Sequence, residues 1–131
     1  MMRFFKRLST RLFLPVGWTL ITIMLLCLPG RTIPGEGLFS IPHFDKIVHI
    51  LLFGGIVFWW GFHLYFRRSD SSKWRKTIVF LAAFSIVLGI VLEFLQLYCI
   101  PNRSFDGGDI IADAAGALLA GLYHLYAKVD I

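Results

Sequence analysis

Long apolar runs alternate with short polar stretches along the chain. Four segments are almost wholly apolar, at residues 12–28, 47–66, 78–100 and 110–127. Each has roughly the 17 to 25 residues that an α-helix needs to cross a bilayer. The pattern therefore predicts an all-α fold, an integral membrane bundle of four transmembrane helices.

Composition favours a membrane setting over a soluble one. Hydrophobic residues make up 57% of the 131 residues, charged residues only 16%, and the mean hydropathy is +0.73. The sequence shows no internal repeat, linker or low-complexity stretch, so we expect a single domain over residues 1–131. The first apolar run follows a basic tail, as in a signal peptide. No small-x-small cleavage site comes after it, and we expect it to remain as a span.

Lysine and arginine gather on alternate loops, which predicts the orientation of the helices. They cluster in the N-terminal tail (Arg3, Lys6, Arg7 and Arg11) and between the second and third runs (Arg67, Arg68, Lys73, Arg75 and Lys76). Because cytoplasmic loops carry the positive excess, both termini and this loop should be cytoplasmic, in a bacterial inner membrane. The net charge of +5 then reflects topology and contact with membrane lipids, and does not indicate nucleic-acid binding.

Two of the apolar runs contain a carboxylate, Glu93 in the third and Asp113 in the fourth. An ionisable group in hydrocarbon is costly and persists where it finds a partner or lines a wet cavity. Helical spacing puts each acid on a face of small and polar residues: Ala82, Ser85, Gly89, Glu93 and Gln96 on the third run, and Asp109, Asp113, Gly116, Ala120 and His124 on the fourth. These faces should meet, with His49 of the second run at the same depth, in one polar layer near the outer surface.

One interpretation of this layer is a binding or catalytic pocket open to the outer side. Glu93 would act as a general base with His49 as its proton partner, and Asp113 would complete the candidate catalytic set. The residues expected to hold a lipid-linked or cell-wall ligand are Lys46, Gln96, Arg103 and Asp106. No established catalytic motif accompanies them, so whether the protein is an enzyme stays open.

The second interpretation is structural. In a scaffold, the polar cluster would only hold the helices together, through Arg103 with Glu93 and Asp106, Gln96 with the fourth span, and His49 with Asp45. Ion conduction is disfavoured because the polar face of the third run does not continue to the cytoplasmic side. We expect no cofactor and no metal, since the acids lack tight ligand spacing and nearby cations would repel a metal ion.

Other polar residues have simpler roles. Asp45 and Asp109 stand at the starts of the second and fourth runs, where a carboxylate caps a helix. Cys27 and Cys99 lie at outer span ends, and we expect two buried free thiols, although a disulfide remains open. A third group, at the cytoplasmic ends, fits an interfacial belt: His63, His124, Trp59, Trp60, Tyr65, Tyr123 and Tyr126.

Several spaced motifs resemble the VanZ-like family of small bacterial membrane proteins. They are Asp45-Lys46-x-x-His49, Glu93-x-x-Gln96, Pro101-x-Arg103, Asp106, Asp109 and Gly116, and the likeness runs from about residue 43 to 121. The resemblance implies a multi-span envelope protein, in a family named for a member linked to low-level teicoplanin resistance. Two positions depart from the family pattern: Ile50 replaces an aromatic, and Asp113 replaces an asparagine. We expect Asp113 to pair with Lys46 or Arg103, or to share a proton with Glu93.

Overall fold

The computed structural model of the protein describes its helices and the turns beside them. The described residues are 3, 4, 7, 11–28, 43–65, 71–101 and 105–126, with only the backbone at 71 and 72. Arg103, expected to bind a ligand or bridge two acids, lies outside the described residues, so that expectation stays a prediction.

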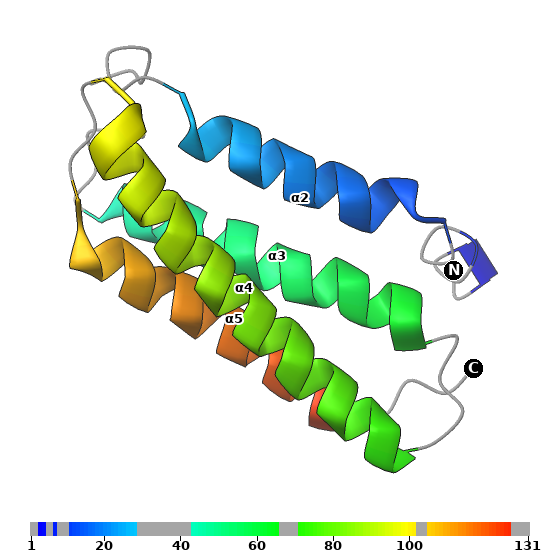
Figure 1. The fold of residues 1–131 in the computed structure, drawn as a ribbon. Coiled ribbons are helices and arrows are strands. Elements are labelled where there is room, and N and C mark those ends of the chain that lie inside the picture. Colours follow the sequence, from blue (N-terminus) through cyan, green and yellow to red (C-terminus); the bar gives the residue numbers. More distant parts are fainter. Residues whose placement is uncertain are drawn as a thin grey trace.

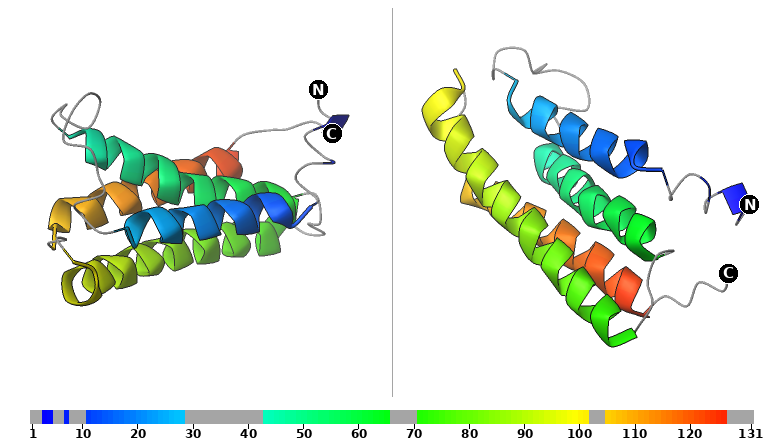
Figure 2. Two further views of the ribbon diagram at one scale, coloured as in Figure 1. Left: turned by 90° about the horizontal axis from the view of Figure 1, so that it is seen from above. Right: turned by 45° about the vertical axis from the view of Figure 1, so that its right-hand side comes forward.

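Four long helices form the described fold. They are α2 (Phe13–Leu26), α3 (Phe44–Tyr65), α4 (Ser71–Cys99) and α5 (Gly107–Tyr126). Chain direction reverses from each helix to the next, so α3 and α5 begin at the end of the bundle where α2 and α4 finish (Figure 1). Figure 2 shows from two further sides that the helices run lengthwise beside one another. The predicted all-α class is confirmed, with one helix for each apolar run.

The largest difference from the predicted boundaries lies at α4, which begins at Ser71 rather than near residue 78. Lys73, Arg75 and Lys76 belong to its first turns. Lysine and arginine are good helix formers, so they extend a helix past its apolar part. Apolar residues mark the stretch that avoids water, whereas backbone hydrogen bonding decides where the helix starts.

The surface of the bundle is strongly apolar. Phe80 is 68% exposed and Ile111 is 73% exposed, and many other large apolar side chains also face outward. Phe44–Tyr65 and Lys73–Cys99 are long and apolar enough to cross a membrane, whereas α2 has 14 residues. Large exposed apolar areas are typical of surfaces that meet lipid or another protein. Among the described helices, two therefore satisfy the requirements for a span by length and composition.

Two apolar clusters make up the interior. One joins α3, α4 and α5 and consists of Val57, Tyr65, Trp74, Ile78, Leu81 and Ala117. The other joins α2, α3 and α4 and consists of Leu26, Leu52, Phe53, Ile56 and Leu92. The second cluster reaches the end of the bundle where α2 and α4 finish, and there it underlies the polar residues.

Glycine allows α3 and α5 to approach closely. A Cβ on Gly116 would lie 2.3 Å from the carbonyl oxygen of Ile50, and one on Gly54 would lie 3.0 Å from the carbonyl oxygen of Gly116. Small residues of this kind let helix backbones meet in membrane proteins. The packing of α5 is more extensive against α3 than against α4. Gly116 thus faces α3, and not the third-run face on which it was expected to pack.

The predicted meeting of the third and fourth runs is nevertheless confirmed at a second glycine. A Cβ on Gly89 would lie 2.6 Å from Asp113 Oδ2, so α4 leaves space there for the carboxylate of α5. Ser85, one turn away on α4, donates a hydrogen bond to the carbonyl of Phe53 on α3 at 3.1 Å. The small and polar face of α4 therefore contacts both α3 and α5.

Tryptophan side chains attach α2 to α3. Trp18 Nε1 donates to the carbonyl of Leu52 at 2.9 Å, and Trp60 Nε1 donates to Thr19 Oγ1 at 3.0 Å. Trp60 was expected in an interfacial belt, but its indole lies between helices, where its apolar ring and single donor both find partners.

The two histidines expected at the interface are also buried in the bundle. His63 is 2% exposed and His124 is 5% exposed. The Nε2 atom of His124 lies 2.9 Å from the carbonyl oxygen of Phe58, and Gly61 opposite it leaves room for the ring. The interfacial interpretation is wrong for this pair, because the aromatic clusters at that end of the bundle enclose the imidazoles.

Both cysteines are free thiols in the structure. Cys27 is half-buried and Cys99 is exposed, so the expected burial of both is wrong for Cys99. The residue lies at the last position of α4, where the bundle no longer covers it.

Candidate functional site

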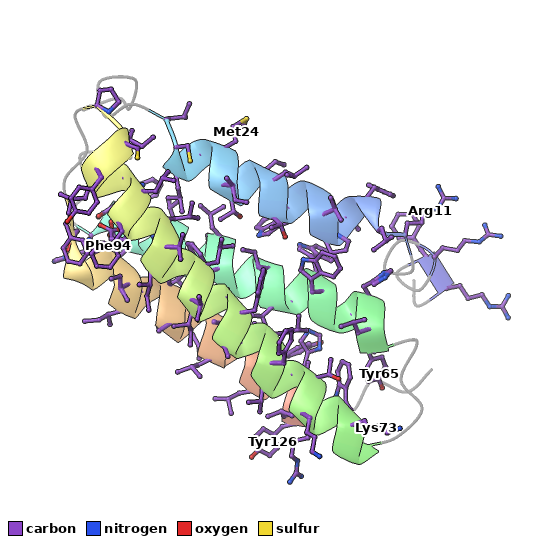
Figure 3. All side chains as sticks on the ribbon, in the orientation of Figure 1. Arg11, Met24, Tyr65, Lys73, Phe94 and Tyr126 are labelled. Carbon is purple, nitrogen blue, oxygen red and sulfur yellow. The ribbon has the colours of Figure 1, made fainter. Side chains whose placement is uncertain are left out.

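The polar residues singled out from the sequence gather at one end of the bundle, where α3 and α5 begin and α4 finishes. Side chains of three helices and the turn before α5 contribute: Asp45, Lys46, His49, Glu93, Asp106, Asp109 and Asp113. Figure 3 marks this end by Phe94 on α4. We call these seven residues the polar cluster.

Lys46 bonds to three carboxylates in the outer part of the cluster. Its ammonium donates to Asp45 Oδ2 at 2.9 Å, to Asp109 Oδ1 at 2.6 Å, and to Asp106 Oδ2. A lysine ammonium has three donors, and carboxylates take all of them here. Lys46 was predicted to hold a ligand, and in this arrangement it would first have to release a carboxylate.

A buried histidine–aspartate pair forms the inner part of the cluster. His49 Nδ1 lies 2.7 Å from Asp113 Oδ1, and the two residues are 5% and 1% exposed. Asp113 was expected to pair with Lys46, Arg103 or Glu93, and His49 with Asp45. Among the described residues, both side chains find each other instead. They lie at equal depth because α3 and α5 start at the same end of the bundle.

The other nitrogen of His49 points toward the outer acids. His49 Nε2 lies 3.5 Å from Asp109 Oδ2, and the Asp109 side chain is 13% exposed. An imidazole with one nitrogen held by a carboxylate and the other facing the mouth of a site is arranged for proton transfer. Asp113, His49 and Asp109 thus form a path of titratable groups from the interior to the rim.

Glu93 is also buried, at 1% exposure, and lies inside the bundle. Its Oε1 atom accepts a hydrogen bond from the backbone N–H of Asp106 at 2.6 Å. This bond attaches α4 to the turn that leads into α5. The predicted pairing of Glu93 with His49 is not the one observed, because His49 bonds to Asp113.

Gln96 belongs to a different contact from the one expected. Its Nε2 atom donates to the carbonyl of Leu26 on α2 at 2.7 Å, and the side chain is 3% exposed. The expected bond to the fourth span is therefore wrong. The last carbonyls of a helix lack partners within it, and Gln96 supplies one at the end of α2.

Asp106, rather than Asp109, caps α5. Asp106 precedes Gly107, the first residue of the helix, and its Oδ1 atom accepts the N–H of Gly108 at 2.8 Å. Asp109 lies in the first turn and binds Lys46 instead. Asp45 likewise lies in the first turn of α3, after Phe44, and accepts from Lys46. In both helices the start lies ahead of the predicted cap, so the predicted carboxylates turn toward the lysine.

The carboxylate of Asp106, at the rim of the cluster, is held in its ionised form by two hydrogen bonds. The hydrogen bond from Lys46 and the bond from the Gly108 N–H hold the pKa of Asp106 below its ordinary value. Its carboxylate therefore stays ionised at neutral pH, and it keeps its contact with the lysine even though half of the side chain is exposed.

Carboxylates outnumber bases in the polar cluster. The cluster contains five acids, of which four contact Lys46 or His49 and the fifth, Glu93, accepts the Asp106 N–H. Oxygens of Asp45, Asp106 and Asp109 all lie within 4.8 Å of one another, close enough to share a cation. The Lys46 ammonium already occupies the position between them, so this set would bind a metal ion only after the lysine moved.

An apolar exterior, two helices with the length and apolarity of spans, and a polar cluster whose inner members are buried are typical of a helical-bundle protein of membrane type. The sequence model of the VanZ/LLP1 family matches residues 10–127. The chain therefore belongs to the VanZ/LLP1 family, as the spaced polar motifs suggested. No curated protein and no solved structure matches it.

Proposed function

We propose that this protein is a multi-pass protein of the bacterial inner membrane with both termini in the cytoplasm. Two helices with the length and apolarity of spans, α3 and α4, support the proposal. Exposed basic residues at the start of α4 support the orientation, because cytoplasmic segments carry the positive excess. The polar cluster lies at the opposite end of α4 and would then face the outer side.

In this orientation, the polar cluster would bind or modify a lipid-linked or cell-wall component. The observation that carries the proposal is the pair of His49 and Asp113 buried beside Glu93. Burying ionisable groups is unfavourable, and intramembrane ionisable residues are most often retained for function. His49 would act in proton transfer with Asp113 orienting its ring, and the negative charge of Glu93, whose Oε1 also accepts the Asp106 N–H, would stabilise the protonated imidazole. The family's association with antibiotic resistance fits a role at the cell wall, and teicoplanin is the agent we would test first.

Charge points to the part of the ligand that the cluster would contact. With five acids and two bases, the described cluster favours amine or hydroxyl groups over a phosphate. Cell-wall fragments carry both kinds of group on their sugars and peptides. We therefore propose contact with the sugar–peptide portion of the ligand.

A structural scaffold is the second candidate. It is supported by the hydrogen bonds that the polar groups make within the protein: Lys46 bonds to three carboxylates, and Gln96 joins α4 to α2. Such contacts would hold the helices in register without a ligand. The two candidates differ in whether an isosteric change in the cluster leaves a folded protein without function.

A binding experiment on the full chain in mild detergent separates them. The probes are a soluble disaccharide–peptide fragment of peptidoglycan and the same fragment on a polyprenyl pyrophosphate. We expect His49→Gln to weaken binding about tenfold or more, since one charge-assisted hydrogen bond is worth about 1.5–3 kcal/mol. Tyr98→Phe is the control, because Tyr98 is 78% exposed near the same end of α4 and lies outside the polar cluster, and it should change affinity less than twofold.

The outcomes are distinct. Loss of binding in His49→Gln, with binding kept in Tyr98→Phe and normal unfolding of both variants, supports the ligand site. No binding of either probe to the wild-type protein, or equal affinity in all variants, contradicts the proposal and leaves the scaffold.

A further inference from the structure

A groove between α4 and α5 lies away from the polar cluster. Its volume is about 270 Å³, and its lining, entirely of apolar residues and a glycine, includes Ile78, Ala82, Ile86, Gly121, Leu122 and Leu125. Gly121 forms part of the floor, because the Cβ that it lacks would lie 3.6 Å from Ile78. The groove follows both helices toward the end where α4 begins and α5 finishes.

Two exposed cations stand at that end of the groove. Arg75 precedes Val79, Ala82 and Ile86 by 4, 7 and 11 residues, so helical periodicity places all four on one face of α4. Lys76 precedes Ala83, another lining residue, by seven residues and lies beside Arg75. The cations and the apolar lining thus form one continuous strip along α4.

The charge of this end is not balanced within the described part of the chain. Arg75 and Lys76 are exposed and make no ion pair with any described acid. Lys73 is also exposed; it is a neighbour of Lys76 three residues on, but it lies nearly opposite Arg75 and farther from the groove lining than either cation. Figure 3 shows Lys73 at the start of α4 and Tyr126 at the end of α5, both at this end of the bundle.

We propose that the groove and its two cations bind an anionic phospholipid of the inner leaflet. The phosphate would lie against Arg75 and Lys76, and one acyl chain would lie in the groove. Basic pockets between membrane helices on the cytoplasmic side are suited to anionic head groups. The apolar lining continues along α4 directly from the cations, so a single phospholipid could contact the cations with its phosphate and the groove with an acyl chain. A second protein helix would fill the groove without requiring the positive charge.

Native mass spectrometry of the full chain in neutral detergent tests the assignment. The probes are phosphatidylglycerol and phosphatidylcholine with identical acyl chains, titrated separately. We expect phosphatidylglycerol to bind more tightly. Arg75→Gln with Lys76→Gln should weaken it about 25-fold, since each charge near an anionic surface contributes about fivefold. Lys73→Gln, on the same turn, should change binding less than twofold.

A second variant tests the groove separately from the charge. Ala83 is an exposed lining residue, so Ala83→Phe fills part of the groove without changing the buried core. We expect it to weaken phosphatidylglycerol binding while glycerol phosphate, which has no acyl chain, binds poorly to every form. The control is Val91→Phe, an exposed residue of α4 outside the groove lining.

Several results would overturn the assignment. Equal affinity for the two lipids would remove the role of charge. An equal loss in Lys73→Gln would show diffuse surface attraction in place of a site. Full binding in Ala83→Phe, or tight binding of glycerol phosphate alone, would remove the groove. A dimer that dissociates in Ala83→Phe would assign the groove to a second copy of the chain.

Discussion

The bond between His49 and Asp113 can be tested by deleting one partner. Asp113→Ala removes the oxygen 2.7 Å from His49 Nδ1 and leaves the imidazole at 5% exposure without this partner. Breaking a buried charged pair costs about 3–5 kcal/mol, and a buried neutral hydrogen bond costs about 1–3 kcal/mol. We therefore expect a loss of about 3 kcal/mol, a large part of a total stability of about 5–15 kcal/mol.

Asp113→Asn is the matched control for this deletion. An asparagine keeps an acceptor oxygen of the same reach but loses the negative charge. If the hydrogen bond is the main contribution, Asp113→Asn should cost about 1 kcal/mol or less. The resemblance to a family that usually carries asparagine here agrees with this expectation.

The assay is unfolding of the purified chain in mild detergent by added dodecyl sulfate, followed by tryptophan fluorescence. A double-mutant cycle with His49→Leu isolates the coupling between the two side chains. A coupling energy of about 1.5 kcal/mol or more supports the pair. The reasoning is refuted if Asp113→Ala unfolds within about 0.5 kcal/mol of wild type, or if the two single losses simply add.

Three further predictions use the same unfolding assay or thiol labelling. Gly116→Ala should destabilise the protein by about 1–3 kcal/mol, because its Cβ would lie 2.3 Å from a carbonyl oxygen of α3. Gly17→Ala is the control: Gly17 has open space around it, so this change should be neutral or stabilising. Equal effects of the two changes would contradict the close approach of α5 to α3. Gln96→Leu should release the end of α2 and speed maleimide labelling of Cys27, and an unchanged rate would show that the bond is unimportant. The pKa of Asp106 is lowered, so its bond to Lys46 stabilises the fold at neutral pH, and this stabilisation is lost as the pH falls below about 4. Asp106→Asn should therefore remove at most about 1 kcal/mol of stability at pH 7 and make stability less sensitive to acid. If stability depends on pH in the same way in the variant and the wild type, the bond does not contribute.

The hydrophobic pattern was sufficient to predict the four long helices of the described residues, but not which helices pack against one another. All four apolar runs coincide with helices, because a helix pairs the backbone polar groups of a long apolar segment within the segment itself. Gly116 shows what the pattern missed. A glycine on a helix face indicates a close neighbour but not which neighbour, and here the neighbour is α3.

The sequence predicted which residues form the polar cluster more accurately than it predicted which of them bond to each other. Depth along each helix correctly brought His49 and Asp113 to one level. Their pairing also required knowing that α3 and α5 lie in direct contact, which only the folded bundle shows. A one-turn shift in a helix start likewise moved the cap of α5 from Asp109 to Asp106.

The burial of His124 could not be seen in the sequence at all. It lies near the end of an apolar run, where interfacial histidines are ordinary. Its partner is a backbone carbonyl, that of Phe58, and every residue has one. Only the space left by Gly61 distinguishes this position, and that space depends on the packing of α3 against α5.

The most direct test of the central claim replaces Glu93 by glutamine in the native gene and measures teicoplanin susceptibility together with the amount of folded protein in the membrane. Glutamine keeps an acceptor for the Asp106 N–H while removing the buried charge. The account predicts a folded protein at normal abundance with altered susceptibility. Unchanged susceptibility with a normal fold, or loss of the fold itself, would contradict a functional role for the polar cluster.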